Sequence, residues 1–182
     1  MKSALALSKY PISLPLAADD IVELHAARLL LLLLHCGTKN RIDGLTKLAK
    51  LDFFVRYPSF FHRIAKQLGR SLSAHNEQVE SMMVRHHYGP WDKRYYQVLA
   101  FLESRGLLAV EKHGNAFHFV LTALGDIKAN VLSDQAPFEL IVLQMKAVKK
   151  LLGRKIGTQL KNLVYTVFDT EIKQRKFGEF IQ

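Results

Sequence analysis

Residues 107–121 read LLAVEKHGNAFHFVL, and this stretch decides the predicted fold. Two apolar runs, 107–112 and 116–121, flank His113-Gly114-Asn115, and the second run alternates through Phe117, His118 and Phe119. That pattern predicts a β-hairpin with a glycine-containing turn. The sequence also predicts a helix on each side of it. The first spans 91–105 and ends at Gly106, and the second spans 123–132 and is capped by Thr122.

Further helices are predicted upstream at 21–35, 44–55 and 60–68, the first of them capped by Asp19 or Asp20. Residues 82–88 read as a short strand closed by Gly89-Pro90, and 70–81 as a loop. The upstream helices are followed by the helix at 91–105, the hairpin at 107–121 and the helix at 123–132. This order of elements is that of a winged helix. We therefore expect an α+β, mostly helical fold: a winged helix-turn-helix with a β-hairpin wing and added C-terminal helices.

The added helices are predicted at 137–152 and 159–168. Pro11 and Pro15 prevent a regular helix near the N-terminus. The expected organisation is an N-terminal arm at 1–18, a winged-helix domain at 19–133 and a C-terminal helical extension at 134–182.

The composition combines positive charge with a high apolar content. Among 182 residues, 26 are Lys or Arg and 16 are Asp or Glu, which gives a formal net charge of +10, and 49% are hydrophobic. The charge indicates a polyanionic partner, and the apolar content indicates a surface covered by another protein. The longest apolar run, 29–34, falls far short of the roughly 20 residues of a membrane span. With Cys36 as the single cysteine, we expect a cytoplasmic protein without a membrane segment.

The positive charge is concentrated in two blocks. Residues 39–70 contain eight basic and two acidic residues, and residues 141–182 contain nine basic and three acidic ones. Phosphate contacts and solvated helix faces are both open interpretations of each block. The outward residues of the helix before the hairpin include types that can reach base edges. The candidate DNA-binding residues are Arg41, Lys47, Lys50, Lys93, Arg94, Gln97, Lys112, Lys149, Lys150, Arg154 and Lys155.

Patterns typical of catalysis are missing. The sequence has neither a GxxxxGK[ST] nor a GxGxxG loop, and neither an HExxH nor a CxxC pattern. His86 and His87 are adjacent in a predicted strand, so their side chains would face opposite sides. We expect no enzymatic activity, no cofactor and no metal site.

Three phrases carry a resemblance to a known family. They are GLTKLAKLDFFVRYP at 44–58, VR at 84–85 leading to YGPWDKRY at 88–95, and SRGLL at 104–108. Together they resemble the small winged-helix middle component of bacterial three-component systems built around an SMC-like or ABC-type ATPase, including the Lamassu-type anti-phage and anti-plasmid systems. The resemblance covers about residues 21–168.

The resemblance implies a non-catalytic adaptor that bridges an SMC-like or ABC-type ATPase and an effector, often a nuclease, and contributes to binding of double-stranded DNA. Candidate residues for partner contact are Trp91, Tyr96 and Phe53. Trp91 anchors either the core or an interface. The alternative function is a stand-alone winged-helix transcriptional regulator that binds DNA and dimerises through its C-terminal helices.

Overall fold

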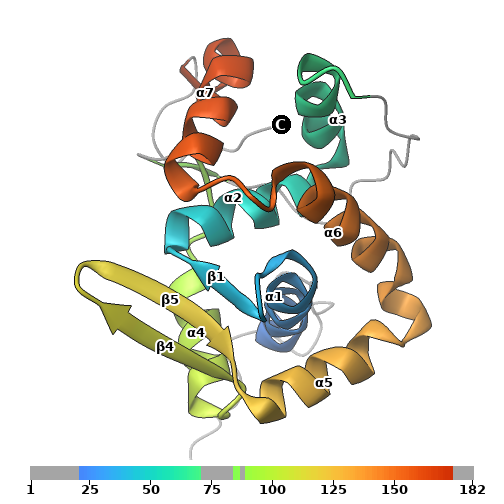
Figure 1. Ribbon diagram of the computed structural model, residues 1–182, viewed down its shortest axis with the longest axis vertical. Coiled ribbons are helices and arrows are strands. Elements are labelled where there is room, and N and C mark those ends of the chain that lie inside the picture. Colours follow the sequence, from blue (N-terminus) through green and yellow to red (C-terminus); the bar gives the residue numbers. More distant parts are fainter. Residues whose placement is uncertain (1–20, 71–83, 87–88, 174–182) are drawn as a thin grey trace, which may run out of the picture.

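A computed structural model describes residues 21–70, 84–86 and 89–173, and helix α1 (Val22–Cys36) lies at its centre (Figure 1). Leu29, Leu31, Leu32 and Leu33 of this helix are fully buried. Because the second half of α1 is apolar all round, it is stable only when other elements cover every side of it. Helices α2 (Leu45–Arg56), α4 (Tyr95–Ser104), α5 (Ala123–Ser133) and α6 (Glu139–Leu152) pack against it.

Two further helices, α3 (Pro58–Gln67) and α7 (Gly157–Lys173), pack on the other side of α2 and lie side by side at the top of Figure 1. A short 3-10 turn, η3 (Ala136–Phe138), joins α5 to α6. One contiguous hydrophobic core contains residues from α1 through α7, including Met145 of α6 and Val164 of α7. The predicted boundary between 133 and 134 therefore does not separate two cores, although it stays a prediction as a domain boundary.

The larger sheet consists of β1 (Arg41–Asp43), β4 (Leu108–His113) and β5 (Ala116–Leu121), all antiparallel in the order β1-β5-β4. Phe119 in the middle strand pairs with Ile42 on one side and Val110 on the other. Phe119 and Ile42 are buried, so this face of the sheet closes the core. A second, two-stranded sheet joins β2 (Val84–His86) to β3 (Gly89–Trp91).

The structure confirms the α+β, mostly helical class, the hairpin and the helices predicted at 21–35, 44–55, 60–68 and 123–132, with ends shifted by one or two residues. The Thr122 hydroxyl caps α5 by accepting from the Gly125 amide at 2.9 Å. Gly106 follows α4 with φ of +66°, which is the left-handed conformation expected of a residue that ends a helix. Among the described residues, no helix combines the length and the apolar composition needed to cross a bilayer.

Two predictions about local structure are wrong. Gly89 and Pro90 do not close a strand but form β3 with Trp91, so α4 begins at Tyr95 instead of Trp91. Strand β1 was not predicted, because three residues are too few to show an alternating pattern. The arm at 1–18, the cap candidates Asp19 and Asp20, and nearly all of the loop at 70–81 lie outside the described residues.

Candidate functional site

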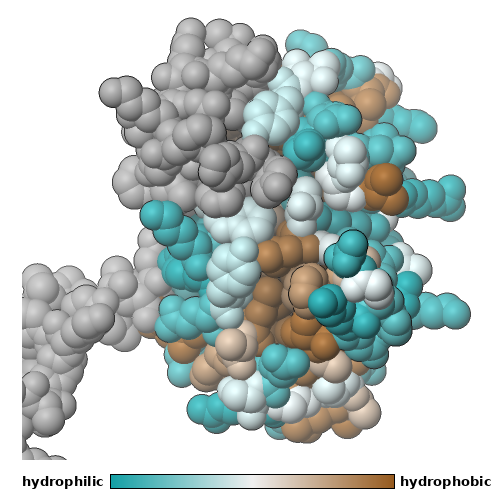
Figure 2. All heavy atoms as spheres, turned by 90° about the vertical axis from the view of Figure 1, so that its left-hand side faces the viewer, coloured by the Kyte–Doolittle hydropathy of each residue, from teal (hydrophilic) through white to brown (hydrophobic). Residues whose placement is uncertain are grey.

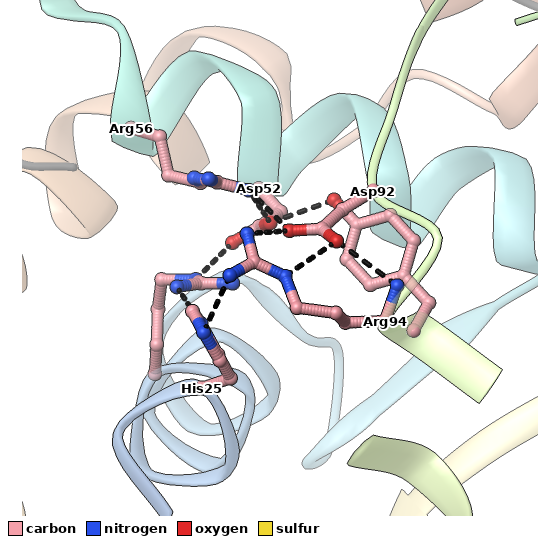
Figure 3. Close-up of polar contacts among 7 residues, drawn as sticks. His25, Asp52, Arg56, Asp92 and Arg94 are labelled. Atoms are coloured by element: carbon pink, nitrogen blue, oxygen red, sulfur yellow. Dashed lines mark hydrogen bonds and ion pairs between the residues drawn. The ribbon is translucent and has the colours of Figure 1, made fainter. Parts of the chain in front are cut away.

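A network of charged side chains lies inside the molecule where α1, α2 and the start of α4 meet (Figure 3). The Asp52 carboxylate on α2 accepts a hydrogen bond from Arg28 Nε on α1 at 2.8 Å and another from the Tyr95 hydroxyl on α4 at 2.7 Å. Asp52 is fully buried, and Arg28 and Tyr95 are nearly so. This carboxylate therefore ties three helices together through charge-assisted hydrogen bonds.

A second carboxylate, Asp92, lies between β3 and α4. Arg94 holds it in a fork, with Nε 2.8 Å from Oδ1 and Nη2 2.7 Å from Oδ2, and Arg56 Nη1 lies 2.8 Å from Oδ2. Burial alone would raise the pKa of Asp92, but the hydrogen bonds from Arg94 and the charges of Arg56 and Arg94 outweigh burial and hold that pKa well below its usual range. The segment that enters α4 is thereby fixed to α2.

His25 on α1 connects the two halves of the network. Its Nδ1 lies 3.0 Å from Arg28 Nη1 and its Nε2 lies 2.8 Å from Arg94 Nη1. A guanidinium group only donates, and a neutral imidazole accepts at one ring nitrogen. In either neutral tautomer, the ring nitrogen without a proton accepts a hydrogen bond from one guanidinium. The other ring nitrogen carries a proton, so at that contact two donors face each other.

The network positions helices through its two carboxylates. Both carboxylates accept from guanidinium groups, which leaves them engaged instead of available as a base. Among residues 21–70, 84–86 and 89–173, no group of three His, Cys, Asp or Glu side chains is arranged to hold a metal ion.

Lys47 and Lys50 on α2 were candidates for contact with DNA, which requires exposed side chains, and for Lys50 this prediction is wrong. Lys50 is fully buried, and burial followed by the charge of Lys161 lowers its pKa to about 7. Lys47 is partly buried, and its Nζ donates to the Gly153 carbonyl at 3.0 Å, at the end of α6. Burial and then the Lys149 charge lower the pKa of Lys47. The Lys50 side chain does not reach the surface, and the ammonium group of Lys47 is bound to the carbonyl at the end of α6.

Lys149 on α6 also serves a structural purpose. Its Nζ donates to the carbonyls of Cys36 at 3.0 Å and of Gly37, and to Thr38 Oγ1 at 3.2 Å. These carbonyls belong to the C-terminal end of α1, where the helix dipole favours a cation. Lys149 therefore caps α1, which is a different use from the predicted contact with DNA.

The aromatic candidates for partner contact divide into two groups. Phe53 is fully buried, with ring centroids 5.1 to 5.2 Å from those of Phe54, Tyr57 and Phe60, so it was wrongly placed at an interface. Trp91 is buried against Tyr95 with ring centroids 5.5 Å apart, which resolves its alternatives in favour of the core. Tyr96 is 66% exposed.

Of the remaining basic candidates, the structure brings Lys150 and Arg154 together at the C-terminal end of α6 and leaves the others apart. Arg94 is held in the buried network, and Arg41 forms an ion pair with Asp43 at 2.8 Å. Lys93 and Gln97 are exposed at α4, and Lys112 is exposed on β4. Lys150 on α6 and Arg154 after it are exposed, and Lys155 is partly so. His86 belongs to β2, while His87 lies outside the described residues.

The buried network was missed at the sequence level, although a signal was present. Asp52 and Arg56 are four residues apart around the apolar triplet FFV, and Arg28 directly precedes the leucine run of α1. Charged residues are rarely fully buried unless they are paired. Charges inside such apolar runs indicate buried partners, but the sequence did not reveal that Asp92 and Arg94 from the YGPWDKRY phrase complete the set.

Comparisons with known proteins add no relative on which this site can be mapped. No protein-family model matches the chain, and neither a curated protein nor a solved structure matches it. Function is therefore inferred from the contacts and surfaces of this chain and from the motif resemblance given above.

Proposed function

We propose that this chain is a winged-helix adaptor subunit of an SMC-like ATPase complex in bacterial defence against phages and plasmids, where it links the ATPase to an effector nuclease. The observation that carries the proposal is an outward apolar stripe on two helices that lie at the edge of the molecule. The stripe is defined by residues Leu124, Ile127, Val131, Leu140 and Leu143, which are 47% to 59% exposed.

The stripe has the spacing of a helix-binding surface. Leu124, Ile127 and Val131 are separated by three and four residues, so they lie on one side of α5, while Gly125 and Ala129 on the other side are buried. Leu140 and Leu143, three residues apart on α6, are exposed as well. Five large apolar residues exposed in this way are typical of a surface that another protein covers.

The winged-helix assignment is supported by the order of elements. Leaving out α3 and the β2–β3 sheet as an insertion, the chain runs α1, β1, α2, α4, β4, β5, and β1 pairs with β5 at the edge of the sheet. In this assignment α4 takes the place of the recognition helix, β4 and β5 form the wing, and α5 to α7 are the added C-terminal helices.

A second exposed apolar area supports contact with more than one partner. On the side that carries the hairpin, hydrophobic side chains gather at the lower middle of the surface, bordered by hydrophilic ones (Figure 2). Phe117 on β5 is 47% exposed and Tyr96 on α4 is 66% exposed. An adaptor needs two such surfaces, one for the ATPase and one for the effector.

Co-expression with an SMC-like ATPase encoded next to the chain tests the proposal. The two proteins should purify together, and Ile127→Glu combined with Val131→Glu should reduce the recovered ATPase at least tenfold. Lys128→Glu on the same helix is the matched control and should leave recovery unchanged. A chain that is monomeric at high concentration and leaves the ATPase unbound contradicts the proposal.

The alternative is the stand-alone regulator, and one observation favours it. Gln97 on α4 and Lys93 just before this helix are exposed, and their side chains can bond base edges in a major groove. A regulator would prefer one duplex sequence, because each base contact discriminates by about 1–3 kcal/mol. Competition between duplexes of different sequence measures this preference.

A further inference from the structure

The most uniform charged surface of the described chain lies at the C-terminal end of α6. Lys146 and Lys150 on α6 and Arg154 just after it follow one another at intervals of four residues, and all three are exposed. Residues four apart face the same side of a helix, about 6 Å apart along its axis. Because Gly153 keeps helical backbone angles, with φ of −60° and ψ of −26°, the line continues beyond the helix. We call Lys146, Lys150 and Arg154 the basic ridge.

The basic ridge is not neutralised by neighbouring acids. Residues 140–168 contain no Asp or Glu. Among the described residues, none of the three ridge side chains makes an ion pair, whereas Arg41 is paired with Asp43. Around α4 and the wing, by contrast, the exposed Lys93, Arg105 and Lys112 are interspersed with Glu103 and Glu111. The ridge therefore holds positive charge that no ion pair among the described residues balances.

The neighbouring lysines tie the backbone that carries this ridge to the rest of the fold. Lys149, between Lys146 and Lys150, turns inward and caps α1, and Lys47 binds the carbonyl of Gly153. In Figure 1 the turn from α6 to α7 crosses in front of α2, where this contact lies. The backbone at the end of the ridge is thus held by Lys47 of α2, and the backbone in its middle by the contact of Lys149 with α1.

We infer that the basic ridge binds the phosphate backbone of duplex DNA without reading its sequence. The choice of DNA rests on the proposed function and on the geometry. A duplex carries about one negative charge per 1.7 Å of axis, so a straight line of cations meets several phosphates at once. A membrane surface fits less well, because an interfacial helix needs apolar residues along its whole length, whereas Leu140 and Leu143 lie at the N-terminal half of α6 and the lysines at the other.

Fluorescence anisotropy with a labelled 25-base-pair duplex of arbitrary sequence tests the inference on the full chain. The triple variant Lys146→Glu, Lys150→Glu, Arg154→Glu should weaken binding at least tenfold at about 50 mM salt. The slope of log affinity against log salt should fall by about three, because each lost phosphate contact removes about 0.9. The matched triple variant Lys93→Glu, Arg105→Glu, Lys112→Glu changes the net charge equally and should weaken binding less than threefold.

Three results would overturn the inference: equal losses in the two triple variants, a larger loss in the α4 and wing variant, or no binding of DNA by the unaltered chain. Tighter binding to vesicles containing phosphatidylserine than to the duplex would overturn it too. Circular dichroism and thermal unfolding check that both variants fold. Recovery of the ATPase with the ridge variant tests the adaptor proposal separately from the DNA-binding inference. If the ridge is not the DNA site, the adaptor proposal still predicts that this variant purifies with the ATPase.

Discussion

Helices α2 and α6 are both rich in basic residues, but they use their charges in opposite ways. The three basic residues of α2, Lys47, Lys50 and Arg56, all turn inward, the first to the end of α6, the second into the core and the third to Asp92. On α6, Lys149 turns inward too, but Lys146 and Lys150 turn to solvent. Local charge in a sequence therefore does not measure charge at the surface, and only the second of these helices offers cations to a ligand.

The largest expected effect comes from breaking the inward arrangement at Asp52. Asp52→Asn removes the carboxylate that Arg28 and Tyr95 share, and it leaves a buried guanidinium group without that counter-charge. Removal of one member of a buried ion pair costs about 3–5 kcal/mol. Urea unfolding should show a loss of this size, against less than about 0.5 kcal/mol for Asp134→Asn at an exposed position. A loss below about 1 kcal/mol for Asp52→Asn would mean that the network does not stabilise the fold.

The second prediction concerns acid and the other carboxylate. The pKa of Asp92 is lower in the folded chain than its ordinary value of 3.8, so Asp92 stabilises the fold fully above that value. As pH falls below about 4, stability should decrease, on the order of 2 kcal/mol by pH 2. Asp92→Asn should be less stable than the natural chain at pH 6, and this difference should shrink as pH approaches 2. A difference that stays constant with pH would exclude a protective ion pair at Asp92.

Much of the fold could be predicted because it follows from short-range patterns. The leucine run of α1, the alternation around Phe119 and the Thr122 cap each depend on residues close in sequence. The spacing of Leu45, Leu48 and Leu51 likewise predicted α2. Such patterns fix which elements form, since each reports the burial of one face.

The candidate site could not be predicted in the same way, because it depends on pairs that are far apart in sequence. Arg28 meets Asp52, Arg56 meets Asp92, and Lys149 meets the end of α1 across more than one hundred residues. Helix α2 was predicted correctly, yet Lys50 was taken as a candidate for contact with DNA, because α7, which packs on α2, follows a hundred residues later. The direction of a charged side chain is set by what packs over its helix, and periodicity within one helix does not contain that information.

The inward lysine of α6 gives the third prediction. Lys149→Met keeps the apolar stem but removes the ammonium group that binds the carbonyls at the end of α1. Loss of this charged cap should reduce stability by about 1–2 kcal/mol. Its neighbour Lys150 points outward, so Lys150→Met should change stability by less than about 0.5 kcal/mol. Thermal unfolding measures both, and equal effects would contradict the difference in direction between these adjacent lysines.

The smallest expected effect has the opposite sign and belongs to Lys50. Because burial lowers its pKa from 10.5 to about 7, the folded chain binds this proton less readily than the unfolded chain. The natural chain should therefore gain stability as pH rises from about 7 towards 10.5, and below pH 7 it bears the full cost of a buried charge. Lys50→Met should therefore stabilise the fold more at pH 6 than at pH 10, since an apolar side chain removes a cost that the natural chain itself loses once Lys50 is neutral. Unfolding in urea at the two pH values measures the difference. If Lys50→Met lowers the free energy of unfolding at pH 6, the buried ammonium group of Lys50 stabilises the fold. That result would contradict the prediction that burial of this charge on α2 is destabilising.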